Sequence, residues 1–140
     1  AWCSCFTESC ACYTFQLWMD AITLLTPNEQ ECIDIFGSDI RAALEAYPNR
    51  LIVTLGAEGA RYFDCENHVH VPGFRADVVD TTGAGDTFNG ALAYAVANGY
   101  PFREAVLFAN AAGSLAVGKM GAQSGMPGLK EVCDRMRERR

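Results

Sequence analysis

The stretch that most constrains this chain is Asp-Thr-Thr-Gly-Ala-Gly-Asp-Thr-Phe-Asn-Gly at residues 80–90. The β-branched run at 76–79 just before it is typical of a strand, and the apolar spacing after it is typical of one helix face. The glycines therefore stand at a strand-to-helix turn. Gly83, Ala84 and Gly85 carry little or no side chain, so their backbone N–H groups can converge on a ligand at the positive end of the new helix. The pattern predicts an anion hole.

Asp86 stands next to this predicted anion hole, in the first helical turn, where the helix dipole favours negative charge. A carboxylate there would repel a phosphate that was merely bound. It suits a general base that takes a proton from a hydroxyl while the N–H groups stabilise a phosphoryl group in transfer. An ordinary Asp at a helix start is the alternative, and the spacing alone does not separate the two.

Composition limits the possible partners. The chain has 140 residues, enough for one domain with a sizeable core, and 20% of them are charged, with a net charge of −6. The only basic cluster, at 135–140, is interleaved with acids, which speaks against a nucleic-acid surface. No apolar run is long enough for a bilayer and no basic leader opens the chain, so no membrane contact and a cytoplasmic location are expected.

Residues 1–20 differ from the rest of the chain. They hold both Trp, no Lys or Arg, and four of the 7 cysteines. We expect an atypical Cys-rich segment not native to the fold, produced by a frame error, a wrong start or a mis-spliced exon; a divergent segment is the alternative. Its Cys-x-Cys pairs lack a nearby His and the usual zinc spacing, so no metal is expected there. The pairs are Cys3 with Cys5 and Cys10 with Cys12.

From residue 21 onward the pattern is that of an α/β domain. The apolar run 51–54 is continuous, as in a central parallel strand covered on both faces. The other expected elements are a strand at 22–25, helices ending at Phe36 and covering 39–47, a hairpin of 60–63 with 68–71, helices at 87–98 and 101–117, a glycine-rich loop at 118–128 and a last helix at 129–137.

Four segments together resemble the ribokinase-like sugar kinases, the phosphofructokinase B type, in the family's order. These are 26–31, 54–59, 80–90 and 119–125. The resemblance implies a three-layer α/β fold with a mostly parallel sheet flanked by helices, and assigns 21–140 to the C-terminal, nucleotide-binding part of the kinase domain. The family's sugar-binding N-terminal half and its β-sheet lid, which often forms a homodimer, have no counterpart here.

The resemblance also implies roles for individual residues. Asp86 is the implied catalytic base, and Glu31 organises Mg²⁺ through water. ATP contacts are implied for Asn28, Thr54, Leu55, Gly56, Ala57, Glu58, Gly59, Gly85, Asp86 and Asn110. A K⁺ site is implied for Asp80, Thr82, Ala116, Lys119, Gly121 and Gly125, the last at a position where the family often has Ser. Oxygen ligands suit such a hard cation.

The expected function is ATP-dependent phosphorylation of a sugar hydroxyl, with ATP, Mg²⁺ and K⁺ as cofactors. The stretches 121–123 and 71–74 favour the ribokinase branch of the family, so ribose, giving ribose 5-phosphate, is the expected acceptor. The alternative is a non-catalytic nucleotide-binding fragment, inactive because the sugar-binding half and lid are missing.

Overall fold

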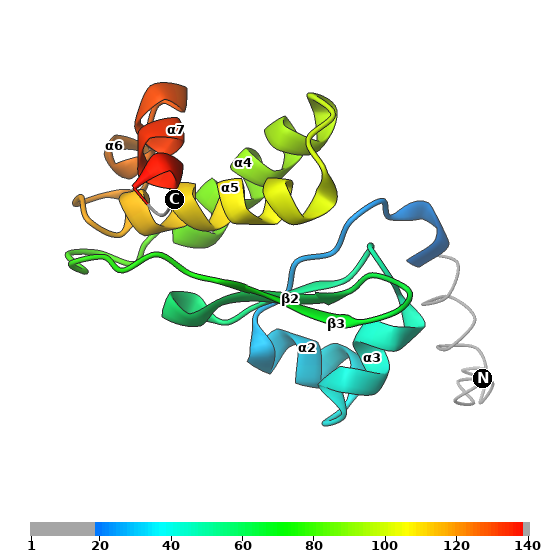
Figure 1. Ribbon diagram of the computed structural model, residues 1–140. Helices are drawn as coiled ribbons and strands as arrows, with labels where there is room; N and C mark the ends of the chain where they lie inside the picture. The colour runs from blue at the N-terminus through cyan, green and yellow to red at the C-terminus, as the bar shows by residue number, and fades with distance from the viewer. Residues whose placement is uncertain (1–18, 139–140) are drawn as a thin grey trace, which may run out of the picture.

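The computed structural model describes residues 19–138 of the chain, so the predictions for the N-terminal cysteines lie outside the described residues. Two helices come first, the three strands follow with a short 3₁₀ helix between the first two, and four helices complete the described part (Figure 1). The elements are α2 (Glu29–Phe36), α3 (Ile40–Ala46), β1 (Ile52–Thr54), the 3₁₀ helix η1 (Gly56–Glu58), β2 (Gly59–Phe63), β3 (His68–Pro72), α4 (Ala84–Ala97), α5 (Phe102–Ala116), α6 (Ala122–Gly125) and α7 (Leu129–Arg137).

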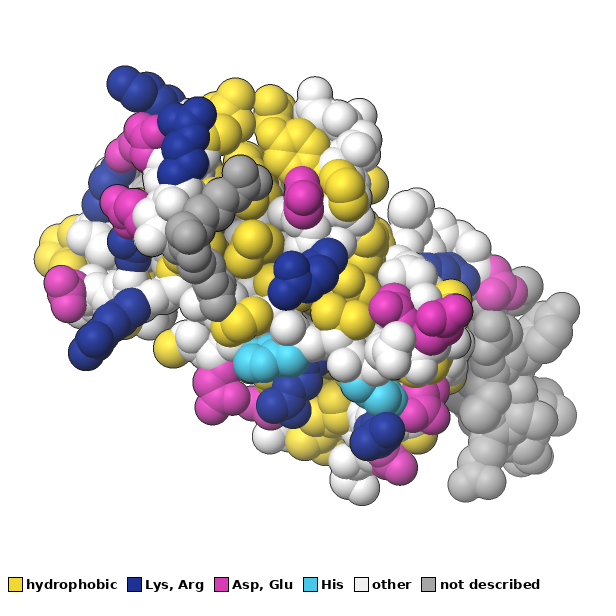
Figure 2. Space-filling model, in the orientation of Figure 1, with side chains coloured by type: hydrophobic (Ala, Val, Ile, Leu, Met, Phe, Trp, Pro, Cys, Tyr) yellow, Lys and Arg dark blue, Asp and Glu magenta, His cyan; other side chains and the backbone are white. Residues whose placement is uncertain are grey.

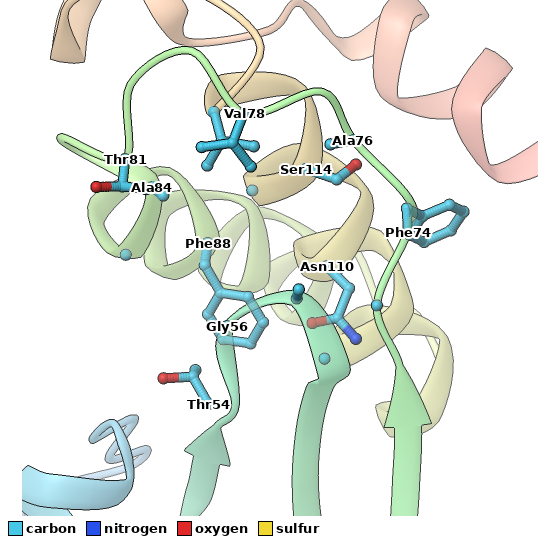
Figure 3. A pocket seen from close by; sticks show the side chains of 16 residues that line it. Thr54, Gly56, Phe74, Ala76, Val78, Thr81, Ala84, Phe88, Asn110 and Ser114 are labelled. Atoms are coloured by element: carbon cyan, nitrogen blue, oxygen red, sulfur yellow. The ribbon is translucent and has the colours of Figure 1, made fainter.

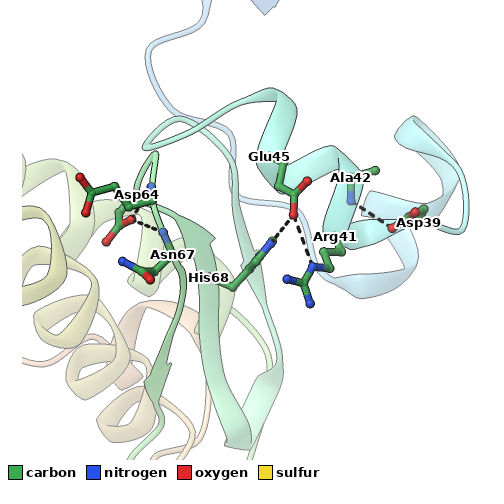
Figure 4. Close-up of polar contacts among 8 residues, drawn as sticks. Asp39, Arg41, Ala42, Glu45, Asp64, Asn67 and His68 are labelled. Carbon is green, nitrogen blue, oxygen red and sulfur yellow. Dashed lines mark hydrogen bonds and ion pairs between the residues drawn. The ribbon is translucent and has the colours of Figure 1, made fainter.

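The three named strands form an antiparallel sheet in the order β1-β2-β3. The predicted hairpin is present, with Arg61 opposite His70. Its turn is closed by Asp64, whose Oδ1 accepts the backbone N–H groups of Glu66 at 3.0 Å and Asn67 at 2.7 Å. Figure 4 shows this turn and, on the far side of the hairpin, the bond of 2.6 Å between His68 Nε2 and Glu45 Oε1 that fastens β3 to α3.

Parallel pairing occurs on the other side of β1. Leu25 pairs with Leu51 and Asn28 with Thr54 as isolated parallel bridges. The predicted strand at 22–25 is therefore reduced to a short pairing. Pro27 lies between the two bridges and has no N–H to donate, and α2 begins directly after Asn28, so the ladder does not extend.

Helices cover both faces of the sheet, which confirms the three-layer α/β fold (Figure 1). Adjacent residues of β1 explain this, because successive side chains of a strand point to opposite faces. Ile52 packs into the core under α4, α5 and α7, whereas Leu51 and Val53 pack into the core under α2 and α3. All three are fully buried, so residues 51–53 are covered on both faces, as predicted. The expected parallel pairing of this strand is limited to the two bridges with Leu25 and Asn28, because its named partner β2 is antiparallel.

The prediction of a strand at 76–79 is wrong. No strand forms between β3 and α4; the N–H groups of Val79 and Asp80 instead donate to the Val117 carbonyl at 2.7 and 3.1 Å. The neighbour of this segment is thus the end of α5, not another strand. Val78 and Val79 are 63% and 58% exposed, so their β-branched side chains lack the packed surface that favours a strand.

The helices begin and end close to their predicted positions, with two differences. The helix expected at 87–98 starts earlier, at Ala84, and the loop expected at 118–128 contains the short helix α6. Gly37 ends α2 with a φ of 89°, a conformation that glycine adopts without strain. Among residues 19–138, no helix has both the length and the apolar character needed to cross a membrane.

Candidate active site

A cavity of about 400 Å³ lies at the edge of the sheet where β1 ends (Figure 3). Three parts of the chain form its walls: the turn between β1 and β2, the extended segment before α4, and the facing sides of α4 and α5. In Figure 3 the side chains of Phe88 and Asn110 point into the space between these three walls. The lining residues are Thr54, Gly56, Ala57, Gly59, Gly73, Phe74, Ala76, Val78, Thr81, Ala84, Gly85, Phe88, Asn110, Gly113, Ser114 and Val117.

The N-terminus of α4 closes one end of this cavity. Gly83 is its N-cap with a φ of 79°, and no side chain caps the helix. The first-turn N–H groups of a helix have no intrahelical partner, so they are donors for an anion. Of the three residues predicted as the anion hole, Ala84 uses its N–H on the Thr81 carbonyl at 3.2 Å. Gly85 lines the cavity, and a Cβ added there would meet no atom within 4 Å.

Asp86 is exposed in the same turn of α4. It does not line the first cavity but borders a second one of about 290 Å³, between α4, α5 and α7. The N-terminus of α4 therefore has a cavity-lining glycine, Gly85, directly followed by an exposed carboxylate, Asp86. The predicted roles of these residues as anion hole and proton acceptor stay predictions.

The turn at 54–59 is shaped by close backbone contacts. Gly59 has a φ of 101°, and a Cβ there would lie 2.2 Å from the Val71 carbonyl oxygen, so only glycine fits. Of the six residues predicted here, Thr54, Gly56, Ala57 and Gly59 line the cavity. Leu55 instead packs with the core under α2 and α3, and the Glu58 carbonyl accepts the Gly73 N–H at 3.0 Å.

Asn28 and Glu31 form a capping box at the start of α2. Asn28 Oδ1 accepts the Glu31 N–H, and Glu31 Oε2 accepts the Asn28 N–H, both at 2.9 Å. Asn28 lies outside the first cavity, in a neighbouring hollow shared with Thr54 and Gly56. Thr26 donates to Asn89 of α4 at 2.6 Å, so the beginning of α2 and the first turns of α4 are held together.

Asn110 lies in the cavity wall on α5 and is 8% exposed. Its Nδ2 donates to the Val71 carbonyl at 2.9 Å and to the Pro72 carbonyl at 3.4 Å. The side chain thus joins α5 to β3. Its predicted contact with a nucleotide stays a prediction, and it would involve a residue that already has a structural role.

The residues predicted as a cation site meet at one corner of the same region. Asp80 accepts the N–H groups of Thr82 at 2.9 Å and Gly121 at 3.0 Å. The Thr82 side chain and these two N–H groups hold the pKa of Asp80 below its ordinary value. Gly125 packs so tightly on Ala116 that an added Cβ would lie 3.0 Å from the Ala116 carbonyl oxygen.

Two further carbonyl interactions define this corner. The Ala116 carbonyl accepts the Lys119 N–H at 3.2 Å, and the Gly121 carbonyl accepts the Gly125 N–H at 2.9 Å. Within residues 19–138, no cluster of three His, Cys, Asp or Glu side chains suits a metal. The oxygen atoms at this corner come from the Asp80 carboxylate, from backbone carbonyls and from the Thr82 and Ser124 hydroxyls, and oxygen ligands suit a hard cation.

Several lining residues were not predicted from the sequence as site residues. Val78 lies on the segment expected as a strand, Phe74 lies just before that segment, and Phe88 was expected only as part of a helix face. The small-residue stretch at 110–114 predicted close approach of a helix or a flat ligand. In the structure Gly113 faces the first turn of α4, and both Gly113 and Ser114 line the cavity.

Comparison with known proteins identifies the family. The sequence model described as pfkB family carbohydrate kinase matches residues 1–129, a range that takes in the Cys-rich first twenty residues. The chain belongs to the pfkB family of carbohydrate kinases.

Known pfkB kinases similar to this chain include ribokinases. The ribokinase of Lactococcus lactis is 44% identical over 121 residues, covering 86% of this chain and 40% of the relative. The ribokinase of Bacillus subtilis is 48% identical over 115 residues, covering 81% and 39%. The structure of Arabidopsis thaliana ribokinase complexed with ribose and ATP superposes with a TM-score of 0.77 at 34% identity, covering 85% of this chain and 42% of that one. The chain thus spans about two fifths of the length of the ribokinases that it matches.

Proposed function

We propose that this chain carries the ATP site and the catalytic base of a sugar kinase that transfers the γ-phosphoryl group of ATP to a hydroxyl of ribose. The observation that carries the proposal is the cavity that ends on the uncapped N-terminus of α4 with Asp86 beside it. The ribokinases among the relatives support ribose as the acceptor. The cytoplasmic location expected from the sequence stays a prediction.

The triphosphate is assigned to the α4 end of the cavity. The open N–H groups of the first turn and the helix dipole stabilise negative charge there, and Gly85 leaves room for the phosphoryl oxygens. The nucleoside then occupies the remainder, between the turn at 54–59, the segment 73–78 and α5. This placement uses all three walls of the cavity.

Asp86 is assigned the role of general base. Its carboxylate would accept the proton of the attacking sugar hydroxyl, while the N–H groups of the α4 turn stabilise the charge on the phosphoryl group in transfer. The Asp86 side chain is exposed, and its neighbour Gly85 lines the cavity, so a hydroxyl placed beside Asp86 would be adjacent to the triphosphate. Positioning of the two reactants is the main source of rate in such transfers.

Two cations belong to the proposal. Mg²⁺ neutralises charge on the ATP phosphates, and the exposed carboxylate of Glu31 is the group assigned to hold its waters. K⁺ is assigned to the corner formed by Asp80, Gly121 and their neighbours, whose donors are oxygens. Bound there, it would steady the turn that precedes α4.

A second candidate function is nucleotide binding without turnover. The chain spans about two fifths of the length of the ribokinases that it matches, and the nucleotide cavity lies within that part. Both candidates require the same ATP site and differ only in whether a sugar is phosphorylated.

Two measurements on the purified chain separate these candidates. Isothermal titration with ATP and Mg²⁺ tests the site itself, and absence of binding would contradict both candidates. An assay of ribose-dependent ADP formation then distinguishes them: turnover supports the kinase, and binding without turnover supports the second candidate. Gly85→Ala is the site variant and Gly90→Ala its matched control, since both positions are open and only Gly85 lines the cavity.

A further inference from the structure

The wall of the cavity formed by residues 73–78 has little secondary structure of its own. It lies between β3 and α4 without being part of a strand. Backbone bonds hold its two ends: the Gly73 N–H donates to Glu58, and the Val79 N–H donates to Val117. Phe74, Ala76 and Val78 nonetheless line the cavity, so this wall needs support from outside the sheet.

Arg135, on α7, contacts two consecutive residues of this wall. One guanidinium nitrogen, Nη2, donates to the Arg75 carbonyl, and the guanidinium carbon lies 6.0 Å from the centre of the Phe74 ring. Phe74 lines the cavity, and in Figure 3 its ring points away from Phe88 and Asn110. A cation over an aromatic face adds an attraction of its own.

The Arg135 side chain is itself held in a defined position. Its Nη1 donates to Glu138 at 2.9 Å, and its side chain is 26% exposed. Its Nε is buried without a hydrogen-bond partner, although an unpaired buried N–H costs free energy. The guanidinium group therefore adopts this orientation despite the unpaired Nε. Its contacts with the Arg75 carbonyl and the Phe74 ring offset that free-energy cost.

The helix that carries Arg135 is fixed against the rest of the site. Val132 is 3% exposed and packs α7 into the core under α5. One turn before Arg135, Glu131 pairs with Lys119 at 3.1 Å, next to the corner assigned to the cation. The basic side chains of α7 are visible on the face shown in Figure 2, beside the hydrophobic surface of α4 and α5.

We infer that Arg135 is a positioning residue for the nucleoside end of the ATP site: it holds the segment 74–78 in the conformation that contacts the nucleoside. The inference rests on the proposed function, because it concerns the same cavity. It assigns Arg135 no contact with the phosphates, which lie at the α4 end.

The test compares Arg135→Ala, Arg135→Lys and Arg137→Ala in the 140-residue chain. Arg137 is the matched control, since it also pairs with an acid on α7, Asp134 at 3.0 Å, but its side chain is 76% exposed and makes none of the contacts with the wall. Three quantities are measured: the dissociation constant for ATP, the inhibition constant of tripolyphosphate as a competitor of ATP, and hydrogen exchange of the 74–78 amides without ligand.

Arg135→Ala is expected to weaken ATP binding about tenfold, which is only part of the contribution of one charge-assisted hydrogen bond plus a cation–π contact, because Arg135 acts on the ligand through the wall. Tripolyphosphate binding should stay unchanged, and the 74–78 amides should exchange faster. Arg135→Lys should fall between wild type and Ala, and Arg137→Ala should match wild type.

Two results would overturn the inference. One is an Arg135→Ala variant that matches Arg137→Ala in ATP affinity and hydrogen exchange. The other is an equal loss of ATP and tripolyphosphate binding, which indicates general damage to the fold. Failure of the wild-type chain to bind ATP would instead contradict the proposed function. Hydrogen exchange would still decide whether Arg135 holds the wall: faster exchange of 74–78 in Arg135→Ala supports that role, and unchanged exchange refutes it.

Discussion

The Asp80 carboxylate and the Gly121 backbone N–H meet at 3.0 Å, and this bond joins the turn before α4 to the loop after α5. The second Asp80 oxygen accepts the Thr82 N–H at 2.9 Å. These hydrogen bonds stabilise the ionised form of Asp80 in the folded chain. Together with the Thr82 side chain, they lower the pKa of Asp80.

The first prediction concerns pH. Because the folded pKa of Asp80 is lower than the unfolded pKa, its contribution to stability is present above the unfolded value and is lost as pH falls through the folded value. We expect Asp80→Asn to lower the melting temperature at pH 7, and the gap to wild type to shrink toward pH 3. Thermal unfolding across this range measures it, with Asp77→Asn as a nearby exposed control. A gap that is the same at both pH values would contradict it.

The second prediction concerns K⁺. If the corner at Asp80 and Gly121 binds K⁺, ordering of these segments steadies the N–H groups of the α4 turn, so ATP should bind more tightly in K⁺ than in Na⁺. Asp80→Asn should remove the difference. Titration of ATP in the two salts at equal ionic strength is the measurement, and equal affinities in wild type would refute the cation site.

The third prediction separates helix stability from ligand binding. Gly85→Ala and Gly90→Ala should each stabilise α4 by about 0.5–1 kcal/mol, because Ala is the better helix former and no atom lies within 4 Å of either added Cβ. Only Gly85 lines the cavity, so only Gly85→Ala should weaken ATP binding. Urea unfolding and ATP titration of both variants check this, and unimpaired binding by Gly85→Ala would place the phosphates elsewhere.

The fourth prediction tests Asp86. In a chain completed with the N-terminal part of a family relative, Asp86→Asn should lower turnover by roughly a hundredfold or more, the range for loss of a general base. ATP affinity should survive, because the N–H groups remain and one negative charge near the phosphates is gone. Glu104→Gln, which removes an acid from the first turn of α5, is the control. Near-full activity of Asp86→Asn would show that another group accepts the proton.

The fifth prediction concerns the turn at 54–59. Gly56→Ala should cost about 1–2 kcal/mol of stability, the penalty for a side chain at its φ of 56° in otherwise open space. Gly59→Ala should cost more, since its Cβ would lie within 2.4 Å of the backbone atoms Val71 O and Gly73 N. Chemical unfolding measures the stability of both variants. Equal losses of stability would mean that the backbone where β2 begins and β3 ends shifts at little cost to accept the added Cβ.

Sequence patterns predicted the parts of this fold that depend on local chemistry. The end of α2 at Phe36 and the continuous burial of 51–53 follow from residue types at fixed spacing, and the structure confirms both. The strand expected at 76–79 failed because its β-branched residues signal a preference for packed surface, and the nearest neighbour in space is the C-terminal end of α5.

Within the site, the sequence pointed to the glycines and acids but not to their partners. The family resemblance implied only that Asp80 and Gly121 belong to one cation site, and the hydrogen bond between them is a finding of the structure. From the sequence, Arg135 was only one member of the basic cluster at 135–140, yet it contacts Phe74 across 61 positions of chain, a pairing that only tertiary structure reveals. Long-range contacts with a segment that has no regular structure leave no periodic signal in the sequence.

Gly83 lies so close to α6 that an added Cβ would stand 2.8 Å from the Ala122 Cβ. The N-cap of α4 therefore leaves no space for a side chain beside α6. Any residue larger than glycine at position 83 would have to displace Ala122, and because position 83 already holds the smallest residue, nothing there can be reduced to admit a larger one at position 122.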